Sequence, residues 1–451
     1  MSEEFVELTA TEAAAKIAGG EISSEEFTRA LIAQVENIED KVGAFAHFDP
    51  EFALAQAKQR DEYRANGNAL GPLHGVPVGI KDCIDTADLP TENGSPLFAG
   101  RRPYRDATVV NRLRAAGAVI FGKTVTTELA FYHPGKTRNP HDLERTPGGS
   151  SSGSAAAVAA GMLPLAIGTQ TNGSIIRPAA YCGVFGMKAS HGLVSRAGVL
   201  AHSRKLDHVG PFARSLDDIA LILDVMAGYD EQDPDTKPYA VPNFLSGVRQ
   251  DPPVMPRLAY VRTPAWSKAD KATAAAFEEL ADSLGEMVQR VELHEPVYGH
   301  AWDDLRAIMT ADMAHHHGKL VSRGGDVASQ TLREFLSEGK RVTATRYLEA
   351  LAQAKQYAQS LGDFFDYYDA ILTPAATGVA PKGTGSTGDP AFCSLWTLTG
   401  LPAVSLPLLQ GENGLPLGVQ LVGPMNRDAR LLRTAKWLLN HLAHDQEAQV
   451  A

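Results

Sequence analysis

One lysine of the sequence directly follows an apolar run, a position in which a lysine can act as a catalytic base. Lys81 ends the segment GVPVGIK, whose apolar residues are typical of a buried strand. Lysines normally stay solvated. In a desolvated site the ammonium form is disfavoured, so the pKa of the side chain falls and the neutral amine can serve as a base. Because a lysine beyond a strand is more often a surface residue, this segment needs support from others.

A second segment, PGGSSSGSAAAVAAG, runs from Pro147 to Gly161 and combines a Gly/Ser loop with an alanine-rich helix. Such a loop gathers backbone N–H groups at a helix N-terminus. A phosphate cradle of the Walker type is excluded, because no Lys ends the loop. Two interpretations remain: a flexible surface loop, or a site that uses the hydroxyl of Ser150, Ser151 or Ser152.

The third segment, IGTQTNGSIIRPAAYCG, contains a strand that ends at Gly168, a tight turn, and Ser174 beyond it. Asn172 and Gly173 both tolerate positive φ. A turn of this kind can aim consecutive N–H groups at one point, which is what an oxyanion hole requires. The alternative is an ordinary strand-to-loop turn.

Together the three segments resemble the amidase-signature family of serine hydrolases, and the resemblance extends from GVPVGIKD to LPLGVQLVG, nearly the whole chain. In that family a Lys, a cis-configured Ser and a nucleophilic Ser form the catalytic triad, which here matches Lys81, Ser150 and Ser174. The family's oxyanion hole consists of backbone N–H groups, here those of Thr171, Asn172, Gly173 and Ser174. The matching scaffold positions are Pro178, Cys182, Gly183, Gly186 and Lys188. We expect Ser151 and Ser154 to cap the following helix or to buttress Ser150.

The motif departs from the commoner family pattern, G-T-D-T-G-G-S-I-R-x-P. Gln170 replaces the acid, Asn172 replaces a Gly, and Arg177 comes one residue later than usual. The T-Q-T and S-x-I-R-P order and the stretch from Gly79 to Glu92 resemble the malonamidase branch, in which the Arg at this position binds the substrate carboxylate. A planar guanidinium near the nucleophile suits a carboxylate. The alternative is that the Arg holds the motif to the scaffold through a salt bridge.

Two aromatic residues, Phe392 and Trp396, lie between Ser386 and Leu398, in another stretch that resembles the malonamidases. We expect them to contact the substrate as a pocket wall, with core packing as the alternative.

Other polar groups of the sequence are weaker candidates. His315–His317 invites a metal site, but successive residues on a helix point in different directions and cannot converge on one ion. Asp82 and Asp85 follow the lysine and are expected to form structural hydrogen bonds at the strand end. We therefore expect no metal and no cofactor.

Alternating helices and short apolar strands predict an α/β fold. We expect a single amidase-signature domain over residues 1–451, around a mixed, largely parallel twisted sheet covered by helices on both faces. Its parts are N-terminal helices at 1–70, a catalytic core at 71–229, a helical flank at 268–365 and a C-terminal return to the core at 366–451. The periodicity predicts helices over 12–18, 23–38, 109–116, 154–160, 215–226 and 431–442. It predicts strands over 118–122 and 163–167 and near 371 and 404.

Bulk composition excludes some classes of protein. The 451 residues carry a net charge of −11, which argues against a nucleic-acid partner, because such partners demand clustered Lys and Arg. Three cysteines do not make a disulfide framework. The N-terminus MSEEFVELTATEAAAK has no apolar signal region, and no run approaches the roughly 20 apolar residues that span a bilayer. We expect a cytoplasmic protein without a membrane partner; a homodimer is compatible with the class.

The function predicted from these features is hydrolysis of a C–N amide bond in a small molecule through an acyl-enzyme, with a carboxylate-bearing amide such as malonamate as a candidate substrate. The main alternative is a hydrolase of aryl amides, esters or carbamates (urethanes), because these offer the same carbonyl to the same nucleophile. The other classes are one component of a multi-protein amidotransferase and a non-catalytic binding protein that kept the fold.

Overall fold

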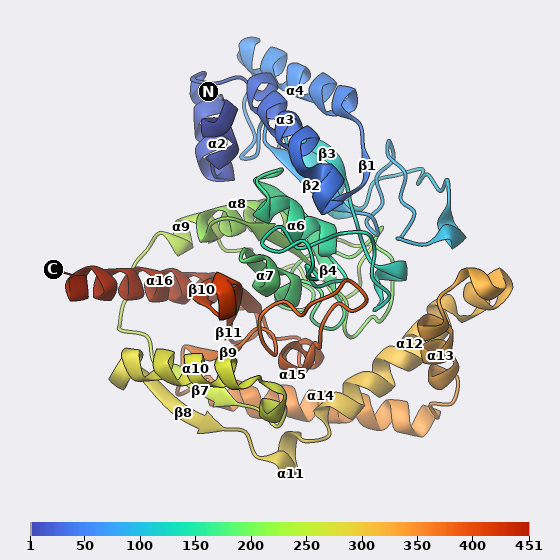
Figure 1. Cartoon of the computed structure of the whole chain (residues 1–451), viewed down its shortest axis with the longest axis vertical. Helices are drawn as coiled ribbons and strands as arrows, with labels where there is room; N and C mark the ends of the chain where they lie inside the picture. Colours follow the sequence, from blue (N-terminus) through green and yellow to red (C-terminus); the bar gives the residue numbers. More distant parts are fainter. Residues whose placement is uncertain (1, 451) are drawn as a thin grey trace.

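The eleven strands of the computed structural model form one sheet, in the order β1-β3-β2-β4-β6-β5-β10-β11-β9-β7-β8 (Figure 1). The structure describes residues 2–450, and side chains over 4–443. The strands are Phe45–Phe48 (β1), Pro77–Lys81 (β2), Val119–Thr124 (β3), Leu165–Gln170 (β4), Phe185–Lys188 (β5), His208–Ala213 (β6), Leu258–Arg262 (β7), Val288–Glu292 (β8), Ala370–Pro374 (β9), Ala403–Gln410 (β10) and Pro416–Val422 (β11).

The α-helices of the described chain fall before, between and after these strands. They are Ser2–Glu7 (α1), Ala10–Gly19 (α2), Ser24–Val42 (α3), Pro50–Ala65 (α4), Thr108–Ala115 (α5), Ser152–Ala159 (α6), Ile176–Cys182 (α7), Leu216–Met226 (α8), Phe244–Val248 (α9), Lys271–Leu284 (α10), Glu295–Tyr298 (α11), Ala301–Gly324 (α12), Gln330–Gly339 (α13), Ala344–Phe364 (α14), Ala391–Leu398 (α15) and Asp428–Val450 (α16). The predicted helices and strands all correspond to elements of this set, with ends displaced by a few residues except in α16, which ends at residue 450 rather than 442.

The sheet is mixed, as predicted, but the prediction that it is largely parallel is wrong. The pairs β2–β3, β2–β4, β7–β8 and β7–β9 are parallel. The antiparallel pairs are more numerous: β1–β3, β4–β6, β5–β6, β5–β10, β10–β11 and β9–β11. A parallel pair needs a long crossover, such as α5 between β2 and β3, whereas a turn over 411–415 suffices to join β10 and β11. A buried apolar strand has the same pattern in either direction, so the sequence did not reveal this.

Helices cover both faces of the sheet (Figure 1). On one face, α5, α8, α9, α10 and α16 bury strand residues such as Ile80, Ile167 and Leu406. On the other face, α3, α4 and α6 pack over Phe121 and Phe212, and α12, α13, α14 and α15 pack over the strands at the opposite end of the sheet. The central strands are therefore enclosed, and side chains at their ends can be withdrawn from water.

The N-terminal helices begin at the residues that the sequence indicates. Thr9 caps α2 and Ser23 caps α3, and in both the third helical residue, Glu12 or Glu26, completes a capping box. The predicted helical flank at 268–365 is mostly helical, but it also contains β8, which pairs with β7 at the sheet edge. The division of the chain into parts stays a prediction, and one continuous sheet is consistent with a single domain.

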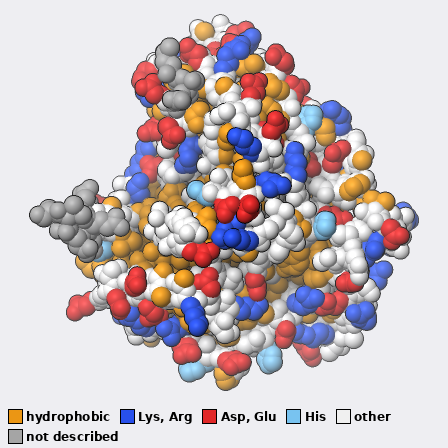
Figure 2. All heavy atoms as spheres, viewed as in Figure 1, with side chains coloured by type: hydrophobic (Ala, Val, Ile, Leu, Met, Phe, Trp, Pro, Cys, Tyr) orange, Lys and Arg blue, Asp and Glu red, His pale blue; other side chains and the backbone are white. Residues whose placement is uncertain are grey.

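The surface is of mixed charge. Acidic and basic side chains are interspersed over the face in Figure 2. Across the described residues, the helices lack the combination of length and apolar character that crossing a bilayer requires.

Candidate active site

Lys81 is the last residue of β2, a strand enclosed between β3 and β4, and its side chain is fully buried. Its Nζ atom donates hydrogen bonds of 2.7 Å to Ser150 Oγ and 2.7 Å to Thr169 Oγ1. Burial lowers the pKa of Lys81 to about 8. A substantial fraction of the Lys81 amine is therefore neutral near pH 8. A neutral amine is the form that can accept a proton from a serine hydroxyl.

The loop that carries Ser150 is held against β4 by the serines that follow. The Gly149–Ser150 peptide bond is cis, as the family resemblance implies. Ser151 stands at the N-cap position of α6 but makes no capping bond; its Oγ donates to Thr169 O at 3.1 Å and accepts from Thr169 N at 3.2 Å. Ser154 Oγ donates to Ile167 O at 3.1 Å. Of the two roles expected for Ser151 and Ser154, the structure shows buttressing rather than capping.

The turn between β4 and α7 is closed by a side chain that the sequence marked only as a departure from the family pattern. Gln170 Oε1 accepts hydrogen bonds from Ile175 N at 2.8 Å and Ile176 N at 3.0 Å. Its Nε2 donates to Thr397 Oγ1 in α15 at 3.0 Å. Gly173 has φ +80°, the conformation for which glycine was expected there. The amide of Gln170 thus fixes the turn that presents Ser174.

The backbone N–H groups of this turn are available to a ligand. Those of Thr171, Asn172, Gly173 and Ser174 make no hydrogen bond to any other residue that the structure describes. The turn is instead held through its carbonyl groups, because Ser151 N donates to Ser174 O at 3.4 Å and Arg177 N donates to Gly173 O at 2.9 Å. Fixed, unused donors next to a serine are the geometry that stabilises a developing oxyanion.

Arg177 lies buried behind this turn, with 1% of its surface exposed. Its Nη2 donates to Gly149 O at 2.7 Å and to Thr387 Oγ1 at 3.2 Å. Its Nε and Nη1 atoms have no hydrogen-bond partner among the described residues, and a Cβ atom on Gly173 would lie 2.9 Å from Nη1. No carboxylate of the described chain forms a salt bridge with Arg177, as a scaffold role was expected to involve. Its contact with the scaffold is instead the hydrogen bond to Gly149 O in the serine loop.

The aromatic candidates Phe392 and Trp396 both lie in α15 and are almost completely buried. Trp396 belongs to the core cluster under α12 and α14, and its indole N–H has no partner in the described part of the chain. The ring of Phe392 packs edge-on against Trp266. Their expected place in a pocket wall stays a prediction.

Three polar residues near Lys81 and the turn before Ser174, Thr169, His202 and Asp207, were not predicted from the sequence. Thr169 joins Lys81 to the loop of Ser151, as described above. Thr171 Oγ1 donates to Asp207 Oδ1 at 2.6 Å and lies 3.3 Å from His202 Nδ1. Thr169, Thr171, His202 and Asp207 together line a cavity of about 190 Å³. The available signals were weak, since single Thr and Asp residues occur throughout the chain.

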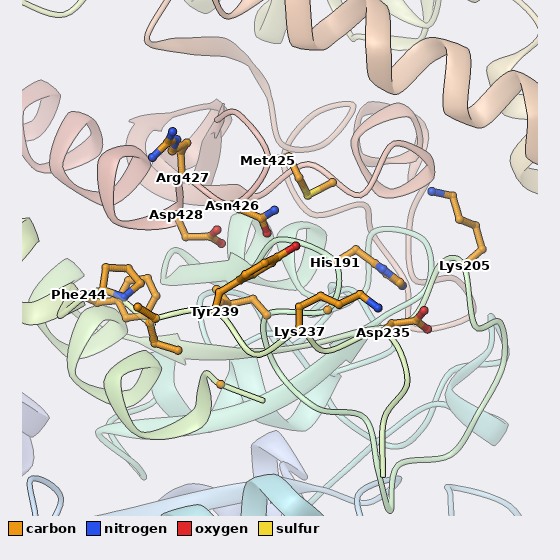
Figure 3. Close-up of a pocket in the computed structure, with 16 residues that line it drawn as sticks. His191, Lys205, Asp235, Lys237, Tyr239, Phe244, Met425, Asn426, Arg427 and Asp428 are labelled. Carbon is orange, nitrogen blue, oxygen red and sulfur yellow. The ribbon is translucent and has the colours of Figure 1, made fainter. Parts of the chain in front are cut away.

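A larger cavity of about 650 Å³ lies elsewhere (Figure 3). Its lining includes Lys237, Tyr239 and Met425, which Figure 3 shows around the opening, and it includes none of Lys81, Ser150 and Ser174. The 190 Å³ cavity is not lined by these three residues either, but it adjoins them through Thr169, which accepts a hydrogen bond from Lys81.

The remaining polar candidates are structural. His315 lines a surface cavity, His316 lines the 190 Å³ cavity, and His317 is buried beside His202, so the three rings do not converge. Asp82 accepts from the N–H groups of Glu92 and Gly94, and Asp85 forms a salt bridge with Arg101. Within residues 4–443, no group of His, Cys, Asp or Glu has the arrangement of a metal site.

Comparison with known proteins agrees with this geometry. Residues 26–432 match the family model Amidase. The chain is 36% identical to a glutamyl-tRNA(Gln) amidotransferase subunit of Chloroflexus aurantiacus, over 95% of this chain and 96% of that protein. The corresponding protein of Streptomyces coelicolor is also 36% identical, over 95% of both chains.

Solved structures give the same result. The peptide amidase of Stenotrophomonas maltophilia superposes with a TM-score of 0.83 at 30% identity, over 96% of this chain and 97% of that one. A 6-aminohexanoate cyclic dimer hydrolase superposes at 0.84 with 28% identity, over 96% of each chain. A chain from a vestigial complex linked to the origins of an s-triazine catabolic enzyme reaches 0.89 at 29% identity, over 96% and 98%. With its fold, its buried lysine–serine pair and these matches, the chain belongs to the amidase family of enzymes that act on C–N bonds.

Proposed function

We propose that this protein hydrolyses a C–N amide bond of a small molecule, with Ser174 as nucleophile, Ser150 as relay and Lys81 as base. The observation that carries the proposal is the 2.7 Å contact between the buried Lys81 Nζ and Ser150 Oγ, beside a turn whose N–H groups are unused. A base needs a pKa near the working pH, and burial brings the pKa of Lys81 to about 8.

The reaction follows from these contacts. Neutral Lys81 accepts the proton of Ser150, which in turn accepts the proton of Ser174 as its oxygen attacks the substrate carbonyl. The N–H groups of residues 171–174 hold the resulting oxyanion. The relay then returns a proton to the leaving nitrogen as the C–N bond breaks, which leaves an acyl-enzyme. Water attacks that ester by the same route and releases the acid.

Substitution of the triad tests the mechanism. Ser174→Ala should abolish turnover, and Lys81→Ala should lower it by about 10²–10⁴-fold, the usual contribution of a general base. Ser150→Ala should lose less, because a water can take the place of the relay hydroxyl. Ser152→Ala is the matched control, since that hydroxyl contacts Val125 O at 3.5 Å and not the triad. Near-full activity of Ser174→Ala would sink the assignment.

The substrate class that we propose is an amide that carries a carboxylate on its acyl side, such as malonamate. Support comes from Arg177, whose buried Nε–H and Nη1–H groups have no partner among the described residues and whose guanidinium adjoins Gly173. Buried donors without acceptors are costly, and a carboxylate is the ligand that a guanidinium fork satisfies best.

A charge-matched pair of substrates tests the role of Arg177. Arg177→Ala should lower kcat/KM for malonamate by roughly one to two decades, the value of a charge-assisted hydrogen bond of about 1.5–3 kcal/mol. The neutral isostere malonamide should lose much less. Because Arg177 also binds Gly149 O, Arg177→Lys checks whether positive charge alone rescues malonamate. Equal losses on both substrates would assign Arg177 to the scaffold.

Two alternatives remain within the family. If the wild type prefers aryl amides, esters or carbamates to malonamate, the carboxylate proposal fails and the serine mechanism stands. The second candidate function, a component of an amidotransferase, is favoured by the 36% identity to proteins of that name. A panel of these substrates, assayed on the isolated chain with gel filtration, separates them: robust hydrolysis by the chain alone favours the amidase. The same filtration tests the proposed homodimer.

A further inference from the structure

Asp207 lies in the loop before β6 and holds the first residue of the oxyanion turn. One carboxylate oxygen, Oδ1, accepts a 2.6 Å hydrogen bond from Thr171 Oγ1. The other, Oδ2, accepts from His202 N at 2.7 Å and from Ser203 N at 2.9 Å. Burial raises the pKa of Asp207 above its ordinary value, and these hydrogen bonds oppose the rise. All three partners donate, so the site is built for the ionised carboxylate rather than for a carboxylic acid.

The same carboxylate lies on a small cavity together with Thr169, the hydrogen-bond partner of the catalytic lysine. Asp207, Thr169 and Thr171 line the 190 Å³ cavity, and Thr169 Oγ1 accepts from Lys81 Nζ at 2.7 Å. Lys81 is buried and makes no salt bridge within the described chain. Burial lowers its pKa, and Cys83 and then Asp207 oppose this lowering. Burial raises the pKa of the Cys83 thiol, so Cys83 is uncharged where Lys81 titrates and Asp207 supplies the carboxylate. An ammonium that forms during proton transfer therefore has the carboxylate of Asp207 to balance it.

We propose that Asp207 is a positioning residue of this active site, which fixes the oxyanion turn through Thr171 and supplies the negative charge that balances the ammonium form of Lys81. The inference rests on the proposed hydrolase mechanism. The two functions depend on different properties of the carboxylate. Its hydrogen bond to Thr171 fixes the position of the oxyanion turn, and its negative charge acts on Lys81.

Other charged groups face the same region and must be distinguished from Asp207. Arg196, Arg204, Asp233, His208 and His316 also line the cavity. Arg196 is paired with Asp233 and Asp235, and Arg204 with Asp235. Burial lowers the pKa of His202 to about 4 and holds that of His208 well below its ordinary value, so both are neutral where Lys81 titrates. Asp312 of α12 accepts from Ser203 Oγ on the other side of the loop.

The test measures the rate at which a fluorophosphonate labels Ser174 as a function of pH, which needs no knowledge of the natural substrate. Labelling requires neutral Lys81, so the rate falls as pH decreases through the pKa of Lys81. In Asp207→Asn the midpoint of this fall should move to lower pH by about half to one unit, because a counter-charge of the ammonium is lost. The plateau rate should also fall, by about tenfold. Thr171→Val should lower the plateau similarly and leave the midpoint unmoved, because the charge remains.

Two controls and two outcomes complete the test. Asp312→Asn and His316→Ala should leave the midpoint at the wild-type pH. A midpoint in Asp207→Asn that matches the wild type overturns the proposal, whatever the plateau. Absence of Ser174-dependent labelling in the wild type would instead overturn the serine mechanism itself. Asp207→Glu keeps the negative charge and should therefore keep the wild-type midpoint. Circular dichroism of Asp207→Asn and Asp207→Glu checks that a shift of the midpoint is not due to misfolding.

Discussion

Two buried lysines lie on neighbouring strands, Lys81 at the end of β2 and Lys123 in β3, and burial lowers the pKa of each to about 8. Their surroundings differ. Lys123 Nζ donates to Ile84 O, Thr86 Oγ1 and Thr91 Oγ1, at 2.6, 3.2 and 2.6 Å, a complete set of acceptors within the fold. Lys81 Nζ reaches the hydroxyl of Ser150, whose loop adjoins a turn with unused N–H groups. A lowered pKa therefore does not identify a base; the group that the amine contacts does.

The largest expected difference between the two lysines is in turnover. Lys81→Met should lower kcat/KM by about 10²–10⁴-fold, because the general base is lost. Lys123→Met, which makes the same change of side chain one strand away, should leave kcat/KM of the folded protein within a few-fold of the wild type. Both variants are measured on one substrate after correction for the folded fraction. Equal losses would show that the contact with Ser150 carries no special role.

The pH dependence of the wild type sharpens the comparison. In the proposed mechanism neutral Lys81 is the reactive form; it predominates above the pKa of about 8 and is lost as pH falls below that value. In the wild type, kcat/KM should therefore fall about tenfold per pH unit below about 8. Lys123→Met should show the same profile, because the titration that limits the rate belongs to Lys81. A flat profile between about pH 6 and 9 would contradict the role of Lys81 as base.

How far the sequence could predict this site depends on what each residue contacts. The sequence allowed Lys81, Ser150 and Ser174 to be proposed, because each lies in a local pattern that determines its surroundings. These patterns are a strand end, a Gly/Ser loop and a tight turn. Asp207 was not, because its contact with Thr171 spans 36 positions and no local pattern accompanies it. Contacts of this kind depend on how strands are ordered in the sheet.

The same limit explains the error in the fold. Apolar runs located β4, β9 and β10, because burial on both faces leaves a clear hydrophobic signal. Strand direction depends on the route of the connections, and β8, with the sequence VQRVE and three exposed residues of five, carries too little apolar signal to be found. The sequence thus predicted the elements better than their pairing.

Lys123 should matter for stability, although it should not matter for turnover. Lys123→Met removes the hydrogen-bond donor of three buried acceptors, which are Ile84 O and the hydroxyls of Thr86 and Thr91. Leaving buried acceptors unsatisfied costs about 1–3 kcal/mol, partly offset because a charged group is no longer desolvated. The free energy of unfolding in urea should fall by this amount at pH 7. An unchanged unfolding midpoint would mean that Lys123 is as dispensable for the fold as for the reaction.

The smallest effect concerns a third buried lysine, Lys188 at the end of β5, whose Nζ donates to Leu401 O at 2.5 Å and whose pKa burial lowers to about 7. In the unfolded chain the same amine has its ordinary, higher pKa, so above about pH 7 the unfolded state binds a proton that the folded state does not. Stability must therefore rise with pH in this range, by up to about 1.4 kcal/mol per pH unit. Lys81 and Lys123, with folded pKa values of about 8, add the same trend, and their titrations overlap with that of Lys188.

Comparison of the wild type with Lys188→Met separates the contribution of Lys188 from that of the other two lysines. The free energy of unfolding should increase with pH above about 7 in both proteins, and more steeply in the wild type than in Lys188→Met. The loss of stability caused by the substitution should consequently be smallest near pH 7 and grow toward pH 8, because the wild type gains more stability than the variant. Urea unfolding at half-unit steps of pH measures both curves. Parallel curves above about pH 7 would mean that burial does not lower the pKa of Lys188 into this range.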